Sequence, residues 1–354
     1  MAAEKKIFFK TDKIREEIET AHAAQQQAEL SKRISQWNGF VKQYPFLQDM
    51  ISDKLKQILL ATFTSATAKA MPPLIVDPVK VAAATAVLNN FLNDPKQVGK
   101  FSQISKQDLV NDILAKIQNP VSIDQGGLNL CGPNAFASAW ALRDPEAYAK
   151  GIIELYTKGK AEIGSVNISV NKSTYKQNPK PILSPADFVL LPAIRHGNNA
   201  LFWYNPAHDQ GFRAFTTPSE LAMWLESIDN ATVKRYESNA ITPQELSRRY
   251  DNGATIIFLI EMEYFLYNNP SLLQTSWSEH YINLVTQYSL QDQPHKLSSP
   301  VGNHYITLAS TFLLSNDKNE FTFSIWNWGA IQSVTMTLER FQASVHEIFV
   351  LDNE

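Results

Sequence analysis

The N-terminal third of the chain carries the spacing of apolar residues that is typical of amphipathic helices. Ile14, Ile18 and Ala21 recur with the 3.6-residue helical period, and apolar positions between residues 30 and 59 continue it. Runs of β-branched residues, which would indicate strands, are missing from this part of the sequence. The pattern predicts a set of packed helices.

Two more helices are expected before residue 120, each with a start signal of its own. Asp77 is a capping residue followed directly by a proline, and Ser105 stands in the same capping place before a segment that stops ahead of Pro120. The composition and pattern of the sequence change after that proline. We therefore predict an all-α N-terminal domain over residues 1–120 and a second domain over residues 121–354.

The second domain is predicted to have helices in its first half and strands in its second. The expected helices are CGPNAFASAWAL, the segment that opens at Asp144, SPADFVLLPAI, TPSELAMWLESI and TPQELSRRYDNG. The expected strands are TIIFLIEM, HYINLVTQY, HYITLASTFLL, FTFSIWNW, QSVTMTL and HEIFVLD. This order predicts an α+β fold in which a helical layer and an antiparallel sheet meet at a cleft.

Charge and hydropathy argue against a polyanionic partner or a membrane span. With 32 Lys and Arg against 35 Asp and Glu, the net charge is -3 at pH 7, so no global basic field exists. The N-terminal apolar run, residues 7–9, is too short for a signal peptide, and Glu261 and Glu263 interrupt the most apolar window. We expect a protein made in the cytosol without a Sec signal, with no nucleic-acid partner and no membrane insertion.

Cys131 is the only cysteine, and its surroundings suit a nucleophile. One cysteine excludes an intramolecular disulfide framework and a multi-cysteine metal site, and no phosphate loop or HExxH spacing is present, so neither a cofactor nor a metal is expected. In CGPNAF the cysteine begins a predicted helix, whose N–H groups and dipole stabilise a thiolate. The alternative is a small buried residue without chemistry.

Gln125 precedes Cys131 by six positions and is the candidate oxyanion donor. Acyl transfer needs hydrogen-bond donors where negative charge develops on the carbonyl oxygen. The side-chain amide of Gln125 and the N–H of Cys131 would supply two such donors, with Gly126 and Gly127 as a flexible connection.

A thiol nucleophile needs a base, and His304 is the favoured candidate among seven histidines. In GNHYITLAS it opens an apolar strand just after a Gly-Asn turn, where a ring at the strand end can face a cleft. His280 stands in the nearly identical setting SEHYINLV and is the alternative base.

Asn327, between two tryptophans in IWNWG, is the candidate for orienting the His304 ring. A buried amide requires a hydrogen bond, and an imidazole N–H would satisfy it. A hairpin tip at residues 315–316 places Asn327 directly opposite His304. A tip at residues 317–318 leaves it opposite Leu308 and roughly 13 Å from His304, at ~3.3 Å per residue, unless a β-bulge restores the contact.

Taken in order, these residues resemble the active site of the papain-like cysteine peptidase superfamily. The CGPNA and HYITL segments are more similar to bacterial members, namely double-glycine leader peptidases and papain-like toxins and effectors, than to papain. Two features depart from the family pattern. The Cys-Gly-Ser-Cys-Trp motif of papain is absent, and 173 residues separate Cys131 from His304, which implies an insertion between residues 165 and 300.

The resemblance implies a papain-like thiol hydrolase with four residues in named roles. Cys131 is the nucleophile, His304 the base, Asn327 the residue that orients the base, and Gln125 the oxyanion donor. Such an enzyme would be a cysteine peptidase or amidase that acts on a protein or peptide. A deamidase, a transglutaminase or an acyltransferase would use the same residues, and a papain-fold interaction protein with an inert thiol is the non-enzymatic alternative.

The similarity to effector-type members also implies a setting. A bacterial toxin or effector delivered by a dedicated secretion system would have the secretion apparatus, a chaperone or an immunity protein as partners. The resemblance does not extend to residues 1–120, which we interpret as a delivery, interaction or regulatory module.

Overall fold

The computed structural model describes residues 76–352, apart from 127, 165, 180–182, 199–203, 207–215, 230, 263–264, 266–303, 315–319 and 328. These residues belong to one compact unit that begins at Ala70. The helices predicted before residue 60 and the predicted strand with His280 lie outside the described residues.

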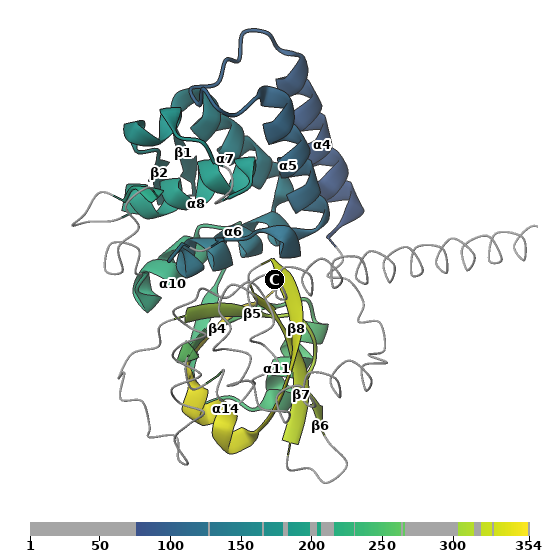
Figure 1. Ribbon diagram of the computed structural model, residues 1–354. Coiled ribbons are helices and arrows are strands. Elements are labelled where there is room, and N and C mark those ends of the chain that lie inside the picture. The colour runs from purple at the N-terminus through teal and green to yellow at the C-terminus, as the bar shows by residue number, and fades with distance from the viewer. Residues whose placement is uncertain are drawn as a thin grey trace, which may run out of the picture. The chain divides into compact units, whose positions relative to one another are not determined.

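Helices make up most of the described chain up to residue 251, and their starts follow from the sequence (Figure 1). The described helices are α4 (Pro78–Asn93), α5 (Lys106–Gln118), α6 (Cys131–Arg143), α7 (Pro145–Lys158), α8 (Pro185–Asn198), α10 (Pro218–Glu226), α11 (Pro243–Asp251) and α14 (Leu338–Ser344), with the 3-10 turns η1 (Pro120–Ser122) and η2 (Lys172–Lys176). Asp77, Ser105 and Asp144 each accept a backbone N–H at a helix start, and Thr217 forms a capping box with Glu220. The seven helices predicted between residues 77 and 253 are therefore confirmed.

The strands among the described residues form two antiparallel sheets. They are β1 (Lys160–Ile163), β2 (Val166–Ser169), β3 (Val233–Glu237), β4 (Thr255–Ile260), β5 (His304–Leu308), β6 (Leu313–Leu314), β7 (Glu320–Asn327), β8 (Ala330–Thr337) and β9 (Val345–Leu351). β1 pairs with β2, and the other seven strands pair in the order β3-β9-β4-β5-β7-β6, with β8 also on β7. Helices followed by an antiparallel sheet confirm the α+β class.

The compact unit does not begin where the sequence placed its boundary. Ala84 and Leu88 of α4 and Ile113 of α5 share one hydrophobic core with Trp140 of α6 and Ile152 of α7. Helical periodicity shows which face of a helix is apolar but not which element covers it. The division near residue 120 therefore differs from the division in the structure, which falls between Lys69 and Ala70.

The large sheet separates two hydrophobic cores, because side chains alternate along each strand. Ile257 and Leu259 of β4 and Tyr305 of β5 pack with the helical core, whereas Phe258 of β4 and Ile306 of β5 join a second core that includes residues of α11 and α14. All residues of β4 are buried. Helix α6 lies between the sheet and the layer of α4, α5, α7 and α8 (Figure 1), and it packs against β5, α7, α8 and α10.

A local irregularity sets the register between β5 and β7. Near the hairpin end, Leu313 pairs with Thr322, whereas Leu308 pairs with Ile325, so four residues, 309–312, lie opposite two residues, 323–324. The Ser310 hydroxyl accepts the N–H of Ser324 at 2.8 Å in place of a strand carbonyl. This two-residue bulge moves Asn327 two positions closer to His304 than the hairpin register alone would place it.

Candidate functional site

Cys131 is the first residue of α6 and is partly buried. The N-cap residue, Leu130, provides no side-chain acceptor for the first turn, so no capping side chain offsets the positive end of the helix dipole beside the thiol. Residues 132–141 of the helix are all buried, which holds its start in a fixed position. The predicted placement of the thiol at a helix N-terminus is confirmed.

Gly132 allows α6 to lie directly on Thr216, the residue before the Thr217 cap. A Cβ atom at position 132 would be 2.4 Å from both Cβ and Oγ1 of Thr216. Only glycine fits this contact. Thr216 therefore fixes the position of the residue that follows the thiol.

His304 and Asn327 form a buried hydrogen-bonded pair. His304 Nε2 lies 2.8 Å from Asn327 Oδ1, and the two residues are 4% and 5% exposed. Because Oδ1 can only accept, Nε2 carries the proton, and in the neutral ring Nδ1 is then the acceptor nitrogen. By extension of the β5–β7 register, Asn327 stands opposite Ile306, so the two residues are diagonal neighbours on one face. The predicted contact is present: the outer hairpin has the register that would leave Asn327 opposite Leu308, and the two-residue bulge moves Asn327 to a position diagonal to His304.

Burial keeps the His304 ring neutral. It lowers the pKa of His304 to about 4, although the Asn327 hydrogen bond favours the charged form. A neutral imidazole at neutral pH is able to take a proton from a thiol.

Gln125 lies in the loop that leads into α6 and is 6% exposed. Its Nε2 donates to the Leu128 carbonyl at 2.7 Å, which fixes the side chain against the turn before Cys131. A carboxamide nitrogen carries two hydrogens, and this contact engages one of them. Gly126 has a φ of 59°, a conformation that glycine adopts without strain, and its N–H is bound by Asp124 Oδ1.

The turn after Asn327 approaches the same loop. Asn327 of β7 pairs with Ala330 of β8, and Gly329, directly before Ala330, has a φ of 69°. A Cβ atom at Gly329 would be 3.2 Å from Cβ of Asp124, the neighbour of Gln125. The Asn327 turn and the Gln125 loop are therefore in direct contact.

Tyr305 links the strand of His304 to the start of α6. Its hydroxyl donates to the Thr216 carbonyl at 3.0 Å, and Thr216 lies against Gly132. Burial raises the pKa of Tyr305, and the negative charge of a Cys131 thiolate raises it further, which places the thiol within electrostatic range of the phenol. Tyr305 and Thr216 thus connect the strand that carries His304 to the helix that begins at Cys131, and the segment after Asn327 lies against the loop that carries Gln125.

A buried ion pair holds the Gln125 loop from behind. Lys116 of α5 and Asp187 of α8 are 3% and 1% exposed and lie 2.8 Å apart. Asp187 Oδ2 also accepts the N–H of Asp124 at 3.1 Å and the hydroxyl of Ser184 at 2.9 Å. Burial raises the pKa of Asp187 to about 6, although Lys116 opposes the shift.

Sequence reasoning did not single out Thr216, Tyr305, Lys116 or Asp187. Only Tyr305 had a local signal in the sequence. Because side chains alternate along a strand, the residue after the proposed base His304 lies on the opposite face of the sheet. The other contacts join residues 63 to 89 positions apart and follow from packing.

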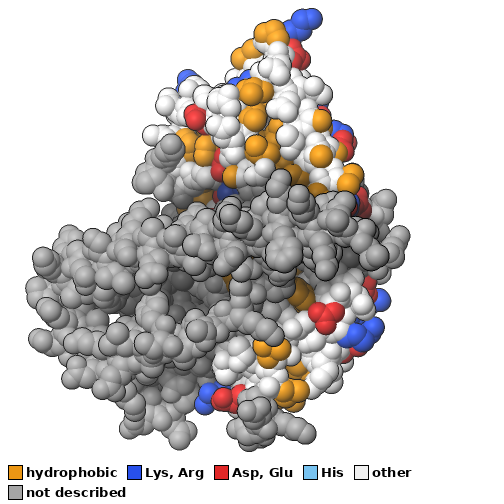
Figure 2. Space-filling model, turned by 90° about the vertical axis from the view of Figure 1, so that its right-hand side faces the viewer, with side chains coloured by type: hydrophobic (Ala, Val, Ile, Leu, Met, Phe, Trp, Pro, Cys, Tyr) orange, Lys and Arg blue, Asp and Glu red, His pale blue; other side chains and the backbone are white. Residues whose placement is uncertain are grey.

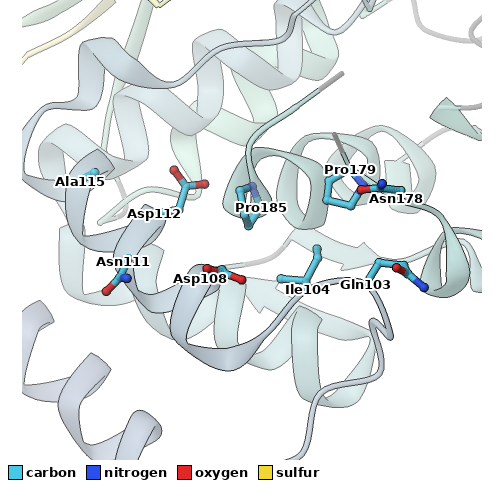
Figure 3. Close-up of a pocket in the computed structure, with 9 residues that line it drawn as sticks. All are labelled: Gln103, Ile104, Asp108, Asn111, Asp112, Ala115, Asn178, Pro179 and Pro185. Atoms are coloured by element: carbon cyan, nitrogen blue, oxygen red, sulfur yellow. The ribbon is translucent and has the colours of Figure 1, made fainter. Parts of the chain in front are cut away.

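A polar cavity of about 400 Å³ lies elsewhere, between α5 and the segment before α8. Figure 3 shows Asp108, Asn111 and Asp112 of α5 on one side of it and Asn178, Pro179 and Pro185 on the other. None of the four candidate residues lines it.

On the coloured surface in Figure 2, basic and acidic side chains lie close together. Lys234 and Arg249 both form ion pairs with Asp352. Within the described ranges, no helix is long and apolar enough to cross a membrane. The same residues contain no cluster of three or more His, Cys, Asp or Glu with metal-binding geometry.

No protein-family model matches the chain, and no curated protein matches it in sequence.

Proposed function

We propose that this protein is a papain-like thiol hydrolase, a cysteine peptidase or amidase that acts on a protein or peptide. The observation that carries the proposal is the 2.8 Å contact between buried His304 Nε2 and Asn327 Oδ1, on a strand packed against the helix that begins at Cys131. An asparagine that holds one ring nitrogen and leaves the other as an acceptor meets the requirement for an oriented base.

In the proposed reaction, Nδ1 of His304 takes the proton of the Cys131 thiol, and the sulfur attacks the carbonyl carbon of an amide. The N–H of Cys131 and the amide of Gln125 stabilise the oxyanion of the tetrahedral intermediate. Its collapse breaks the carbon–nitrogen bond while Nδ1 returns the proton to the leaving amine. Water, deprotonated by His304, then hydrolyses the thioester at Cys131 and restores the thiol.

The neutral state of the ring fits these steps. Because burial lowers the pKa of His304 to about 4, the ring holds a second proton at neutral pH only together with a nearby thiolate. The thiol and imidazole should therefore titrate as one unit.

Alkylation with iodoacetamide across pH tests the proposal. Cys131 is the only cysteine among 354 residues, so every alkylated thiol is this one. We expect rapid alkylation at pH 6. His304→Ala should slow it about 300-fold, the thiolate fraction left when the thiol pKa returns to ~8.5.

His346→Ala is the matched control, since His346 is also a partly buried strand histidine with a pKa lowered by burial. It should leave the alkylation rate unchanged. If the alkylation rate of the unmodified protein followed an ordinary thiol pKa of ~8.5, the hydrolase proposal would be refuted. Loss of reactivity in His280→Ala but not in His304→Ala would assign the base to His280.

The role of a secreted bacterial effector or toxin rests on the resemblance and is part of the same proposal. It predicts that expression inside a target cell is harmful, and that Cys131→Ser removes the harm at equal protein level.

A further inference from the structure

Three elements meet at Thr216, and none of its contacts is needed by the reaction steps above. Thr216 is 2% exposed, its backbone carbonyl accepts the Tyr305 hydroxyl at 3.0 Å, and its hydroxyl accepts Nη1 of Arg195 at 3.2 Å. On its third side it lies against Gly132, with no room for a Cβ atom. The carbonyl, the hydroxyl and the side-chain volume of Thr216 are thus all engaged in contacts that fix its position.

Arg195 connects Thr216 to the helical layer. The guanidinium is 2% exposed and pairs with Glu220 Oε1 at 2.9 Å, and it lies 5.7 Å from the centre of the Trp224 ring. The second carboxylate oxygen of Glu220 accepts the N–H of Thr217, the cap of α10. One carboxylate therefore fixes both the arginine and the backbone next to Thr216.

Tyr305 connects Thr216 to the sheet. It is 5% exposed, pairs with Leu259 of β4 and packs against Phe349 of β9 at 6.1 Å between ring centres. Its backbone directly follows that of His304. Movement of Tyr305 relative to Thr216 would therefore change the position of the base relative to the thiol.

We propose that Tyr305 is a positioning residue that aligns His304 with Cys131 by binding the Thr216 carbonyl. The inference rests on the proposed hydrolase. The reacting atoms belong to a helix and to a strand. The Tyr305 hydroxyl bonds the strand to Thr216, and Thr216 in turn lies against Gly132 at the start of the helix. The phenol remains protonated during turnover because burial raises its pKa, so it acts as a fixed donor and not as an acid.

The test is the pH profile of Cys131 alkylation in Tyr305→Phe, which removes one hydroxyl and keeps the ring. We expect the inflection of the rate to move up by about one pH unit, and the rate at pH 6 to fall about tenfold, the size of one lost hydrogen bond. At pH 9.5, where the thiolate forms without help, the two proteins should react at similar rates.

Tyr156→Phe is the matched control. Tyr156 is also buried, and its hydroxyl donates to the Ile104 carbonyl at 2.8 Å, within the helical layer and away from β5. It should lose a similar amount of thermal stability and keep the profile of the unmodified protein. An unchanged profile in Tyr305→Phe, or equal shifts in both variants, would overturn the positioning role.

Failure of the hydrolase proposal has a different signature. In that case the unmodified protein itself shows an ordinary thiol titration, and there is no alignment for Tyr305 to maintain. If Tyr305→Phe does not unfold cooperatively, Thr216→Val takes its place, because it removes the Arg195 bond that fixes Thr216, and with it the carbonyl that accepts the Tyr305 hydroxyl. It should shift the inflection in the same direction by about half a unit, and no shift would overturn the proposal.

Discussion

Lys116 with Asp187 and His304 with Asn327 form two buried pairs of the same length, 2.8 Å, but of different charge. The first joins α5 to α8 behind the Gln125 loop, and the second joins β5 to β7. Removing two charges from water costs several kcal/mol per ion, which further hydrogen bonds must offset. Asp187 has two such bonds besides Lys116, and Lys116 also donates to the Ser122 carbonyl.

The neutral pair avoids this cost and keeps a use that the charged pair lacks. The His304 ring can still accept one proton, and the pair needs a counter-charge only while it holds that proton. The ion pair is charged at rest, and its contacts through Asp187 Oδ2 hold a loop in place, while Asp187 Oδ1 is buried without a hydrogen-bond partner. The difference indicates that burial of a polar pair suits chemistry when the pair is neutral and suits structure when it is charged and bonded to the surrounding backbone.

Breaking the ion pair should have the largest effect on stability. Asp187→Ala leaves Lys116 buried without its counter-charge, and we expect the free energy of unfolding to fall by about 3–5 kcal/mol in chemical denaturation. The double variant Lys116→Met, Asp187→Leu removes both charges and should be clearly more stable than the single variant. Equal stability of the two would show that the charge is not what the pair contributes.

The two pairs should have opposite effects on how the free energy of unfolding changes with pH. The folded pKa of Asp187, about 6, is above its ordinary value of 3.8, so the folded state keeps a proton that the unfolded chain loses, and stability falls as the pH rises from about 4 to 6. The folded pKa of His304, about 4, is below 6.5, so stability rises with pH over nearly the same interval. Each effect amounts to roughly 3 kcal/mol.

Single variants separate these two effects. Denaturation between pH 4 and 6.5 should show stability rising with pH in Asp187→Asn and falling in His304→Gln, with a flatter curve in the unmodified protein. Parallel curves in all three proteins would contradict the comparison.

Gln125 lies between the two regions, and two chemical probes should separate its role from that of the base. Alkylation forms no oxyanion, so Gln125→Ala should leave its rate unchanged. Acylation by p-nitrophenyl acetate forms one, and its burst should slow about 100-fold. Gln177→Ala, which removes an amide that bonds to Ser173 and Asn205, is the control. If Gln125→Ala reacted as fast as the unmodified protein with both probes, Gln125 would be excluded as an oxyanion donor.

Asn327→Ala should have the smallest effect. Loss of the acceptor for Nε2–H allows the ring to turn, and we expect the alkylation rate at pH 6 to fall about tenfold, with about 1 kcal/mol lost from the free energy of unfolding. Asn198→Ala, which removes an amide bonded to the Ile194 carbonyl, should cost similar stability without loss of rate. A rate equal to that of the unmodified protein would mean that Asn327 does not orient the base.

Local signals in the sequence were sufficient for most helices and strands. Capping residues followed by proline marked α4, α7, α10 and α11, and β-branched runs marked β4 and β5. Four elements were missed, namely β1, β2, β3 and α14. The strand β3 is an edge strand of sequence VKRYE, which lacks a buried alternation, so its place beside β9 depends on the partner strand.

The candidate site was predictable in part, and the limit was register. The residue types and order identified Cys131, His304 and Asn327, but the contact between the last two depends on two extra residues near Ser310. A bulge is favoured by contacts with neighbouring strands and by one serine hydroxyl, and neither is visible in a hydrophobic pattern. The partner of Asp187, 71 residues away on α5, was equally beyond local reasoning.

The bulge at Ser310 also separates the site mechanically from the far end of its sheet. Two surplus residues lie between β5 and β6. We therefore expect that a change of strand register or of loop length in the outer hairpin leaves the pairing of β5 with β7 near His304 unchanged. We likewise expect a peptide inserted into the hairpin beyond the bulge to leave the contact between His304 and Asn327 intact.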